Sequence, residues 1–475
     1  MNNLPKEYTR HFFLPEDQRL FDYDQIFSVS AMWVELGMEN VEATYDLYVR
    51  HLPKKRNFMI FAGLDEIIQG ILNWTYTDEE VKYLLDNGII TPKCAALMKD
   101  YKFKGDVWAM PEGSIFFPAE PVVRITGKIW EVNLMTFFLI NALTSNTIFS
   151  TKIVRSYLAA EGKYKVVTGP SIRAHGHESG LKFGRAAYMF GAPSNIVPAF
   201  SRKFEMPMSG VNTKAYHAFI TSFSSELEAM RKATSVFPKI SFMIDTYGTK
   251  QGIRNFITVA KENQAAGKPL PTGVVIDSGD SVRDFANQAT YVRKELDKAG
   301  LKEVQITVTG NFEEERISQY VKIGAPADKI LVFTELVVPG DDPKLEAVLK
   351  LAQYEHDGQT DFAVKLAKGK ISYPGEKQVF RKYNEGKIAG DIIGLSNEDL
   401  GTKLLQPYIE DGKLLSPMPT LDEIRKFTLE QLKKLPKPMC SVWKLAKYRV
   451  ETSRSLEDLL EKAKNRAYTK RDNSE

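Results

Sequence analysis

A regular alternation of short apolar segments with helical patterns, in the middle third of the chain, constrains the fold most. The apolar segments recur roughly every thirty residues, which is the spacing of strands in a parallel sheet whose strands are joined by helices. Strands are predicted at 240–244, 274–276, 304–308 and 329–333, with helices at 252–266, 281–299 and 313–322. Because these strands are almost entirely apolar rather than alternating, both faces of the sheet are expected to be buried.

The predicted fold class is therefore α/β, with either an open doubly wound sheet or a closed β/α barrel. No G-x-G-x-x-G fingerprint follows any of the strands, which disfavours a dinucleotide-binding fold, and we favour the barrel. In either architecture the active site lies at the carboxyl ends of the strands. Polar residues follow four consecutive strands at that end, namely Asp245, Asp277, Asn311 and the pair Thr334-Glu335. Each of them alone is more often a loop residue or a helix cap than a catalytic residue, but four polar strand ends from consecutive units are stronger evidence than any one.

The flanking segments predict a second, α+β domain that is built from both ends of the chain. Its first part covers residues 1–145, the barrel with the catalytic site covers 146–340, and residues 341–475 complete the first domain. The last of these segments is richer in charge and in Pro-Gly turns, and its final stretch from Arg454 is expected to be a helical tail.

Composition excludes several classes of protein. The 475 residues include 64 Lys and Arg against 60 Asp and Glu, and a net charge of +4 is too small to indicate a nucleic-acid partner. Two cysteines, Cys94 and Cys440, cannot form a disulfide scaffold or a four-cysteine zinc site. There is neither a signal peptide nor a sufficiently long apolar run, so no membrane partner and a cytoplasmic location are expected.

Three histidines and one acidic turn are the candidates for chemistry. His175 and His177 have a spacing that can bind a metal, but no Cys or further His lies nearby, so a phosphate site or a polar loop explains them better. His217 follows a turn and is expected to open a helix that runs to about Lys232, where it is either a nucleophile or general base or a helix-start residue. The turn 277–280, Asp-Ser-Gly-Asp, can hold a sugar diol or hydrated Mg²⁺, or can simply cap a helix.

An ordered set of motifs resembles one family. Each motif is weak alone, but together they span Asp24 to about Leu395 in family order. They lie at 24–30, 58–64, 111–121, 151–155, 173–176, 184–188, 245–247, 277–280 and 374–381. In these motifs the chain resembles the nicotinate phosphoribosyltransferases, which have the type II phosphoribosyltransferase fold.

This resemblance implies a fold, a reaction and a set of partners. The implied fold is a β/α barrel beside a domain assembled from both termini. The implied reaction joins nicotinate to 5-phosphoribosyl 1-diphosphate in NAD salvage, with Mg²⁺ on the departing diphosphate and ATP as co-substrate. The protein would mainly position the reactants and stabilise an oxocarbenium-like transition state. The family also implies a phosphorylated histidine and a homodimer with shared active sites.

The resemblance assigns roles residue by residue. His217 matches the phosphorylated histidine and Asp277 the carboxylate that binds the ribose diol, so both are predicted to be catalytic. Phe27 matches a tyrosine that stacks on the pyridine ring in the neighbouring subunit's site. The remaining predicted substrate-binding residues match diphosphate contacts or strand ends, namely Arg173, His175, Asp245, Ser278, Gly279, Asn311 and Thr334.

Three positions depart from the family pattern. Val275 stands where the family has an arginine, and 331–334, Leu-Val-Phe-Thr, replaces the Gly-x-Gly-Thr loop that binds the 5′-phosphate. The segment that leads to His217, Thr213 onwards, is one residue longer than usual. Losing a charge-assisted contact costs roughly 1.5–3 kcal/mol. A phosphoribosyltransferase for another base such as nicotinamide, or a non-catalytic relative, are therefore the alternatives to the nicotinate enzyme.

Overall fold

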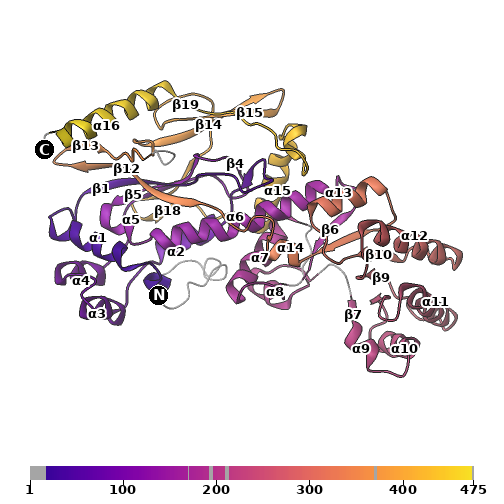
Figure 1. Ribbon diagram of the computed structural model, residues 1–475. Helices are drawn as coiled ribbons and strands as arrows, with labels where there is room; N and C mark the ends of the chain where they lie inside the picture. The colour runs from indigo at the N-terminus through magenta and orange to yellow at the C-terminus, as the bar shows by residue number, and fades with distance from the viewer. Residues whose placement is uncertain (1–17, 170, 192–195, 209–212, 368–371, 473–475) are drawn as a thin grey trace. The chain divides into compact units, whose positions relative to one another are not determined.

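The computed structural model of the chain describes residues 18–169, 171–191, 196–208, 213–367 and 372–472. The chain divides into two compact units. The terminal unit is built from residues 1–151, 344–439 and 445–475, and the inserted unit from residues 152–343 and 440–444. Figure 1 shows the course of the chain through both.

The inserted unit contains a parallel sheet. In the described part of the chain it has six strands, in the order β6-β11-β10-β9-β8-β7. The strands are β6 (Lys165–Thr168), β7 (Thr213–Ala215), β8 (Ser241–Met243), β9 (Gly273–Ile276), β10 (Gln305–Val308) and β11 (Lys329–Val332). The four strands predicted between 240 and 333 are thus present and neighbour one another.

Helices follow the strands of this sheet, as the alternation of patterns predicts. They are α7 (His177–Phe190), α8 (Pro198–Phe204), α9 (His217–Thr221), α10 (Glu226–Val236), α11 (Thr249–Ala265), α12 (Val282–Lys298), α13 (Glu314–Ile323) and α14 (Thr334–Val337). The start of α12 is fixed by Ser281, whose hydroxyl accepts a hydrogen bond of 3.1 Å from the Asp284 amide. Its buried residues include Phe285 and Val292, and this face packs against β9 and β10.

The closed barrel that the sequence favoured is not confirmed. Among the described residues the sheet is open, with β6 and β7 as its unpaired edges. The order of the strands is that of a ring from which the β6–β7 link is missing. The described part of β7 is three residues long, and its pairing with β8 has an irregular register.

The single helix expected from His217 to about Lys232 is also wrong, because it is two helices. α9 ends at Thr221, and α10 begins after Ser225, whose hydroxyl accepts a 3.2 Å hydrogen bond from the Glu228 amide. Ser225 therefore restarts the chain as a helix instead of continuing one.

The terminal unit contains a largely antiparallel sheet to which both ends of the chain contribute. Its order among the described residues is β13-β12-β1-β5-β3-β17-β18. The strands are β1 (Glu42–Val49), β3 (Asp106–Ala109), β5 (Pro121–Lys128), β12 (Ala347–His356), β13 (Gln359–Phe362), β17 (Gln406–Glu410) and β18 (Lys413–Leu414). β1 lies between β5 and β12, so a strand from the start of the chain is paired on one side with a strand from beyond the inserted unit.

Two smaller sheets and eight helices complete the terminal unit among the described residues. The additional strands are β2 (Met59–Ile60), β4 (Ile115–Phe116), β14 (Lys377–Asn384), β15 (Lys387–Leu395), β16 (Thr402–Lys403) and β19 (Val450–Thr452), and the helices are α1 (Asp24–Glu35), α2 (Leu64–Leu72), α3 (Asp78–Asp86), α4 (Pro92–Lys99), α5 (Ile129–Asn133), α6 (Thr136–Ala159), α15 (Leu421–Lys433) and α16 (Arg454–Asp472). The last turns of α6 belong to the inserted unit. α16, yellow in Figure 1, packs against β15. No helix of the described residues has the length and apolarity that a membrane span requires.

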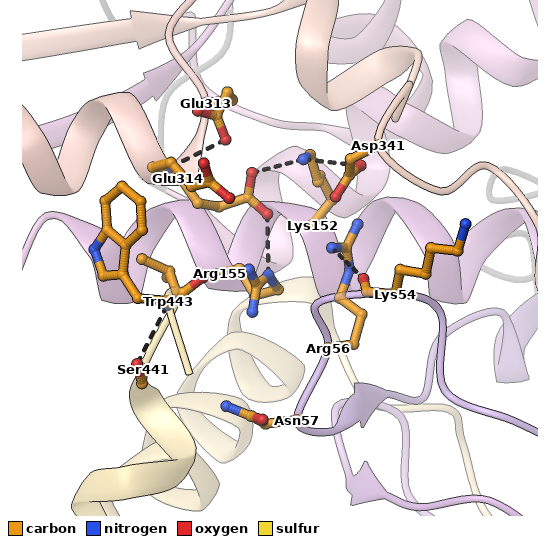
Figure 2. Close-up of polar contacts among 12 residues, drawn as sticks. Lys54, Arg56, Asn57, Lys152, Arg155, Glu313, Glu314, Asp341, Ser441 and Trp443 are labelled. Atoms are coloured by element: carbon orange, nitrogen blue, oxygen red, sulfur yellow. Dashed lines mark hydrogen bonds and ion pairs between the residues drawn. The ribbon is translucent and has the colours of Figure 1, made fainter. Parts of the chain in front are cut away.

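A buried ionic cluster joins α6 to the start of α13 within the inserted unit (Figure 2). The carboxylate of Glu314, which is 1% exposed, lies 2.6 Å from the Lys152 ammonium and 3.0 Å from Arg155 Nε. Lys152 also lies 3.1 Å from the Asp341 carboxylate. The two cations are therefore neutralised where water does not reach them.

Candidate functional site

Three of the predicted residues follow neighbouring strands at the same edge of the parallel sheet. His217 comes two residues after β7, Asp245 two residues after β8, and Asp277 directly after β9. Since parallel strands end at a common edge, this topology places the three side chains in one region.

Hydrogen bonds join the loops that carry these residues. The backbone amide of Asp277 donates to Oδ2 of Asp245 at 3.0 Å, which ties the loop after β9 to the loop after β8. On the other side, Nδ1 of His217 lies 2.8 Å from the hydroxyl of Thr246, and Nε2 lies 3.9 Å from Oδ1 of Asp245. His217, Asp245 and Asp277 therefore form one cluster, which is called the strand-end cluster below.

The strand-end cluster combines buried charge with an accessible imidazole. The Asp245 side chain is 2% exposed and that of His217 is 41% exposed. Oδ1 of Asp245 is buried and has no hydrogen-bond partner among the described residues. A buried carboxylate oxygen is costly to leave unpaired, so this atom marks the place of a donor or a cation.

Burial raises the pKa of Asp277, and the like charge of Asp245 raises it further. The neighbouring His217 acts on this pKa in the opposite direction. Two carboxylates held this close resist simultaneous ionisation unless a cation is shared between them. The cluster is thus suited to a positively charged or hydroxyl-bearing ligand.

The carboxylate oxygens of Asp245 and Asp277 are hard ligands of the kind that Mg²⁺ prefers. No group of three His, Cys, Asp or Glu side chains is arranged to hold a metal ion within the described ranges. A Mg²⁺ that keeps most of its ligands as water and phosphate oxygens could be held by Asp277 at the open turn, whereas the zinc alternative at His175 and His177 gains no support.

The turn after β9 carries two further predicted residues. Ser278 and Gly279 are exposed, and the turn leads into the Ser281 cap of α12. A side chain on Gly279 would meet the buried ring of Phe285 at 2.9 Å, so the backbone here lies directly on the core. One side of the turn therefore rests on the core, and the opposite side is exposed to solvent.

The next two strand ends differ from each other. Asn311 is exposed and has a φ of 52°, and it follows Gly310, where a side chain would meet the Asp277 carbonyl oxygen at 2.5 Å. Thr334 is half-buried as the first residue of α14. Before it, Phe333 packs its side chain against Gly169 at the end of β6. A side chain therefore fills the position at which an open glycine loop would expose its backbone amides.

Arg173 and His175 lie in the exposed segment between β6 and α7. They share the carboxyl end of the sheet with the strand-end cluster, but they follow the edge strand β6, whereas His217 follows the other edge strand β7. The structure therefore places these residues at the predicted end of the sheet without a described contact to the strand-end cluster.

Two predicted positions lie in hydrophobic cores. Phe27 is 2% exposed in α1, within the core of the terminal unit. Val275, which stands where the family carries an arginine, is 2% exposed inside β9. The stacking role of Phe27 stays a prediction, and its ring packs within its own chain.

Thr246 is the one residue of this site that sequence reasoning passed over. It lies in the family-like motif at 245–247, but the motif itself predicts no role for its hydroxyl. The usable signal is its position: it directly follows a strand-end aspartate, one strand away from the histidine. Only the structure shows that the hydroxyl meets His217.

Comparisons with known proteins agree with these observations. A family model described as the nicotinate phosphoribosyltransferase N-terminal domain matches residues 23–144, and one for the C-terminal domain of the same enzymes matches residues 401–460. A nicotinate phosphoribosyltransferase of Mycobacterium tuberculosis is 32% identical over 425 residues, which cover 89% of this chain and 88% of the relative. That of Bacillus subtilis is 29% identical over 386 residues, covering 80% and 76%.

Solved structures show the same fold. Human nicotinic acid phosphoribosyltransferase superposes with a TM-score of 0.81 at 21% identity, covering 93% of this chain and 99% of the human one. A nicotinate-nucleotide pyrophosphorylase from Pyrococcus furiosus gives 0.67 at 22% identity, covering 91% and 99%. At these identities the superpositions concern the fold alone.

Proposed function

The chain belongs to the nicotinate phosphoribosyltransferase family, and we propose that its strand-end cluster is the reaction centre at which nicotinate joins 5-phosphoribosyl 1-diphosphate. The observation that carries this assignment is the convergence of His217, Asp245 and Asp277 from three neighbouring strands. The reaction breaks the bond between the ribose and the diphosphate and forms one between the ribose and the ring nitrogen of nicotinate.

The position of each carboxylate in the cluster suggests its role in the reaction. The Asp277 carboxylate, at the open turn before Ser278, can accept hydrogen bonds from the two ribose hydroxyls. The buried Asp245 receives the Asp277 amide and so holds that turn in place. Both negative charges favour the positive charge that develops on the ribose in an oxocarbenium-like transition state. When bound, Mg²⁺ neutralises the diphosphate as it leaves.

ATP coupling is the second part of the proposal. The γ-phosphoryl group of ATP would move to a ring nitrogen of His217, with the P–O bond to ADP breaking as the P–N bond forms. Two features support this role: the imidazole is 41% exposed, and a buried carboxylate stands beside it. An accessible ring next to a fixed negative charge suits a nucleophile that becomes positively charged on reaction.

The third part of the proposal concerns which base is the substrate and which residues bind the 5′-phosphate. The buried Val275 supplies no cation for the nicotinate carboxylate, which favours nicotinamide as the alternative substrate. Phe333 fills the expected phosphate loop, so other residues of the open edge, Arg173 and His175 among them, are the proposed anion contacts.

The proposed assembly is a homodimer with shared active sites in the cytoplasm. Because Phe27 is buried in its own chain, direct stacking on a pyridine ring in a partner's site would require its release from that core.

The test is mononucleotide formation from 5-phosphoribosyl 1-diphosphate and Mg²⁺. Nicotinate, nicotinamide and quinolinate are offered separately, each with and without ATP. We expect product from nicotinate that increases with ATP, together with an acid-labile phosphate label on the protein that is lost in His217→Ala. Product from nicotinamide alone would change the assigned base, and a label that persists in His217→Ala would remove His217 from the phosphorylated position. If a folded preparation forms no product from any base, the proposed activity is wrong and the protein is assigned a non-catalytic, binding role.

A further inference from the structure

The hydroxyl of Thr246 is the only described polar group within hydrogen-bond distance of Nδ1 of His217, and none of the roles assigned above uses it. The two atoms are 2.8 Å apart. Thr246 belongs to the loop after β8, whereas His217 is the first residue of α9, so the contact bridges two separately anchored segments.

The imidazole of His217 is only partly enclosed by the protein. α9 is only five residues long, and the His217 side chain is 41% exposed. A ring with that exposure is held by packing on part of its surface only, so a hydrogen bond to one of its nitrogens adds to what selects its rotamer. The hydrogen bond at Nδ1 therefore helps to decide which way the ring faces.

The neighbour of Thr246 in sequence stands on the other side of the ring. Oδ1 of Asp245 is buried without a hydrogen-bond partner among the described residues and lies 3.9 Å from Nε2. Asp245 and Thr246 thus present a carboxylate to one nitrogen and a hydroxyl to the other. An ionised carboxylate can only accept a hydrogen bond, whereas a hydroxyl can donate or accept.

These requirements select one tautomer of the neutral ring. The unpartnered Oδ1 of Asp245 needs a donor, so the proton belongs on Nε2, and Nδ1 then carries the lone pair to which the Thr246 hydroxyl donates. We propose that Thr246 is the positioning residue of His217, holding the ring so that Nε2–H faces Asp245 and Nδ1 is kept as the nucleophilic nitrogen. This inference rests on the proposed phosphohistidine role of His217.

The proposal gives each atom a place in the phosphoryl transfer. Nδ1 attacks the γ-phosphorus of ATP, the P–O bond breaks, and ADP leaves with its electron pair. The ring then carries phosphate on Nδ1 and a proton on Nε2, and its positive charge faces the Asp245 carboxylate. The Thr246 hydroxyl, displaced from the lone pair, can donate to an oxygen of the new phosphoryl group.

Two substitutions separate the hydroxyl from the shape of the side chain. Thr246→Val keeps the shape and removes the hydrogen bond, while Thr246→Ser keeps the hydroxyl. We expect Thr246→Val to lower kcat by about tenfold or more, with KM for nicotinate and for 5-phosphoribosyl 1-diphosphate changed less than about threefold, because the ring and not the substrate has lost a partner. Thr246→Ser should recover most of the lost kcat. Thr290→Val is the matched control, since that exposed hydroxyl bonds only the Ala286 carbonyl within α12.

A spectroscopic measurement tests the inference without any turnover. NMR of isotope-labelled imidazole nitrogens in the full-length protein should show His217 with its proton on Nε2. In Thr246→Val both nitrogen signals should move toward the values of a histidine that exchanges its tautomers, while Thr246→Ser and Thr290→Val keep the wild-type pattern.

Two results would overturn the inference: a wild-type proton on Nδ1, or a Thr246→Val protein with unchanged nitrogen signals and unchanged kcat. The measurement also separates the two proposals. If the wild-type protein makes no mononucleotide, the proposed function fails, and the nitrogen signals still decide whether Thr246 orients His217.

Discussion

At the residue scale, the proximity of two carboxylates dominates the site. Asp277 is partly buried and lies beside the charge of Asp245, and both effects raise its pKa. It therefore keeps its proton to a higher pH than an ordinary aspartate and ionises more readily when a cation or a donor approaches. Substrate binding and the charge of this residue are consequently linked.

Removing the charge of Asp245 should lower the pKa of Asp277. In Asp245→Asn the amide oxygen can still accept the Asp277 backbone hydrogen bond, but the like charge is gone, so the neighbouring carboxyl loses its proton at lower pH. NMR titration of isotope-labelled aspartate carboxyls measures the change. Asp297→Asn, at an exposed position of α12, should leave this pKa unchanged. An unchanged or raised pKa in Asp245→Asn would show that the two carboxylates do not interact.

Sequence reasoning located the members of the strand-end cluster because strand ends in a parallel sheet are neighbours by construction. Asp245 and Asp277 were found by that rule, and His217 from its turn and the family resemblance. Thr246 and the burial of Phe27 were beyond reach, because both depend on side-chain packing between segments that are distant in the chain. The sequence pattern predicts which residues lie at the carboxyl edge of the sheet. It does not predict that the Thr246 hydroxyl contacts the His217 nitrogen.

At the scale of elements, a buried ionic cluster anchors α13 to α6. Glu314, the first residue of α13, sits between Lys152 and Arg155 at 1% exposure (Figure 2). Removing one member of a buried ionic cluster leaves its partners uncompensated, which costs far more than losing a surface pair. Glu314 thus carries the contact between the two helices, while Lys152 has a second partner in Asp341.

Replacing Glu314 by glutamine should destabilise the protein by about 3–5 kcal/mol, since the shape is kept while two buried cations lose their shared counter-charge. Urea unfolding followed by circular dichroism measures the loss. Glu303→Gln, the same chemical change at an exposed position, should fall within about 0.5 kcal/mol of wild type. Equal midpoints for the two variants would mean that the cluster adds nothing to stability.

The errors at this scale have identifiable physical causes. The helix was expected to run without a break from the turn before His217 to about Lys232, yet Ser225 followed by Glu228 is a helix-start signal that divides it. The barrel was favoured because no dinucleotide-binding glycine fingerprint follows the strands, and that absence does not distinguish a closed sheet from an open one. Closure also requires the two edge strands to pair, and among the described residues β6 and β7 do not.

At the scale of the whole molecule, a five-residue segment returns to the inserted unit after the chain has left it. Residues 440–444 belong to that unit although the residues on both sides do not. Within the segment, Trp443 donates from its indole nitrogen to Ser318 at 2.8 Å, and the Lys322 ammonium lies 4.8 Å from its ring centre. Both partners are in α13, so the segment acts as a strap over that helix.

Trp443→Ala should loosen α13 selectively. A hydrogen bond and a cation–π contact are lost from a residue that is 45% exposed, for an expected cost of about 1–2 kcal/mol. Hydrogen exchange of the amides in α13 should become faster, while exchange in β1 stays unchanged. Trp443→Phe, which keeps a ring over Lys322, should show a smaller effect. Equal acceleration in both regions would contradict a local role for the strap.

Which parts of the fold can be predicted depends on how far apart in the sequence the contacting elements lie. The strands β8 to β11 and the helices α11 to α13 follow one another along the chain, so periodicity and spacing predict them within a few residues. The antiparallel pairing of β1 with β12 joins two strands that are separated in sequence by the inserted unit, so no local sequence pattern indicates it. That pairing depends on which hydrophobic faces meet, and a single sequence does not specify them.

The position of β1 also sets the order of events at the ribosome. One edge of β1 can pair with β5 soon after both emerge, but its other partner, β12, is translated about 300 residues later. At roughly 5–20 residues per second this leaves an interval of about 15–60 s in which a strand that is buried in the finished fold has an open edge. A nascent chain of this topology is exposed to wrong pairing while the inserted unit is still being made, and chaperone occupancy during translation should therefore be highest between the appearance of β5 and that of β12.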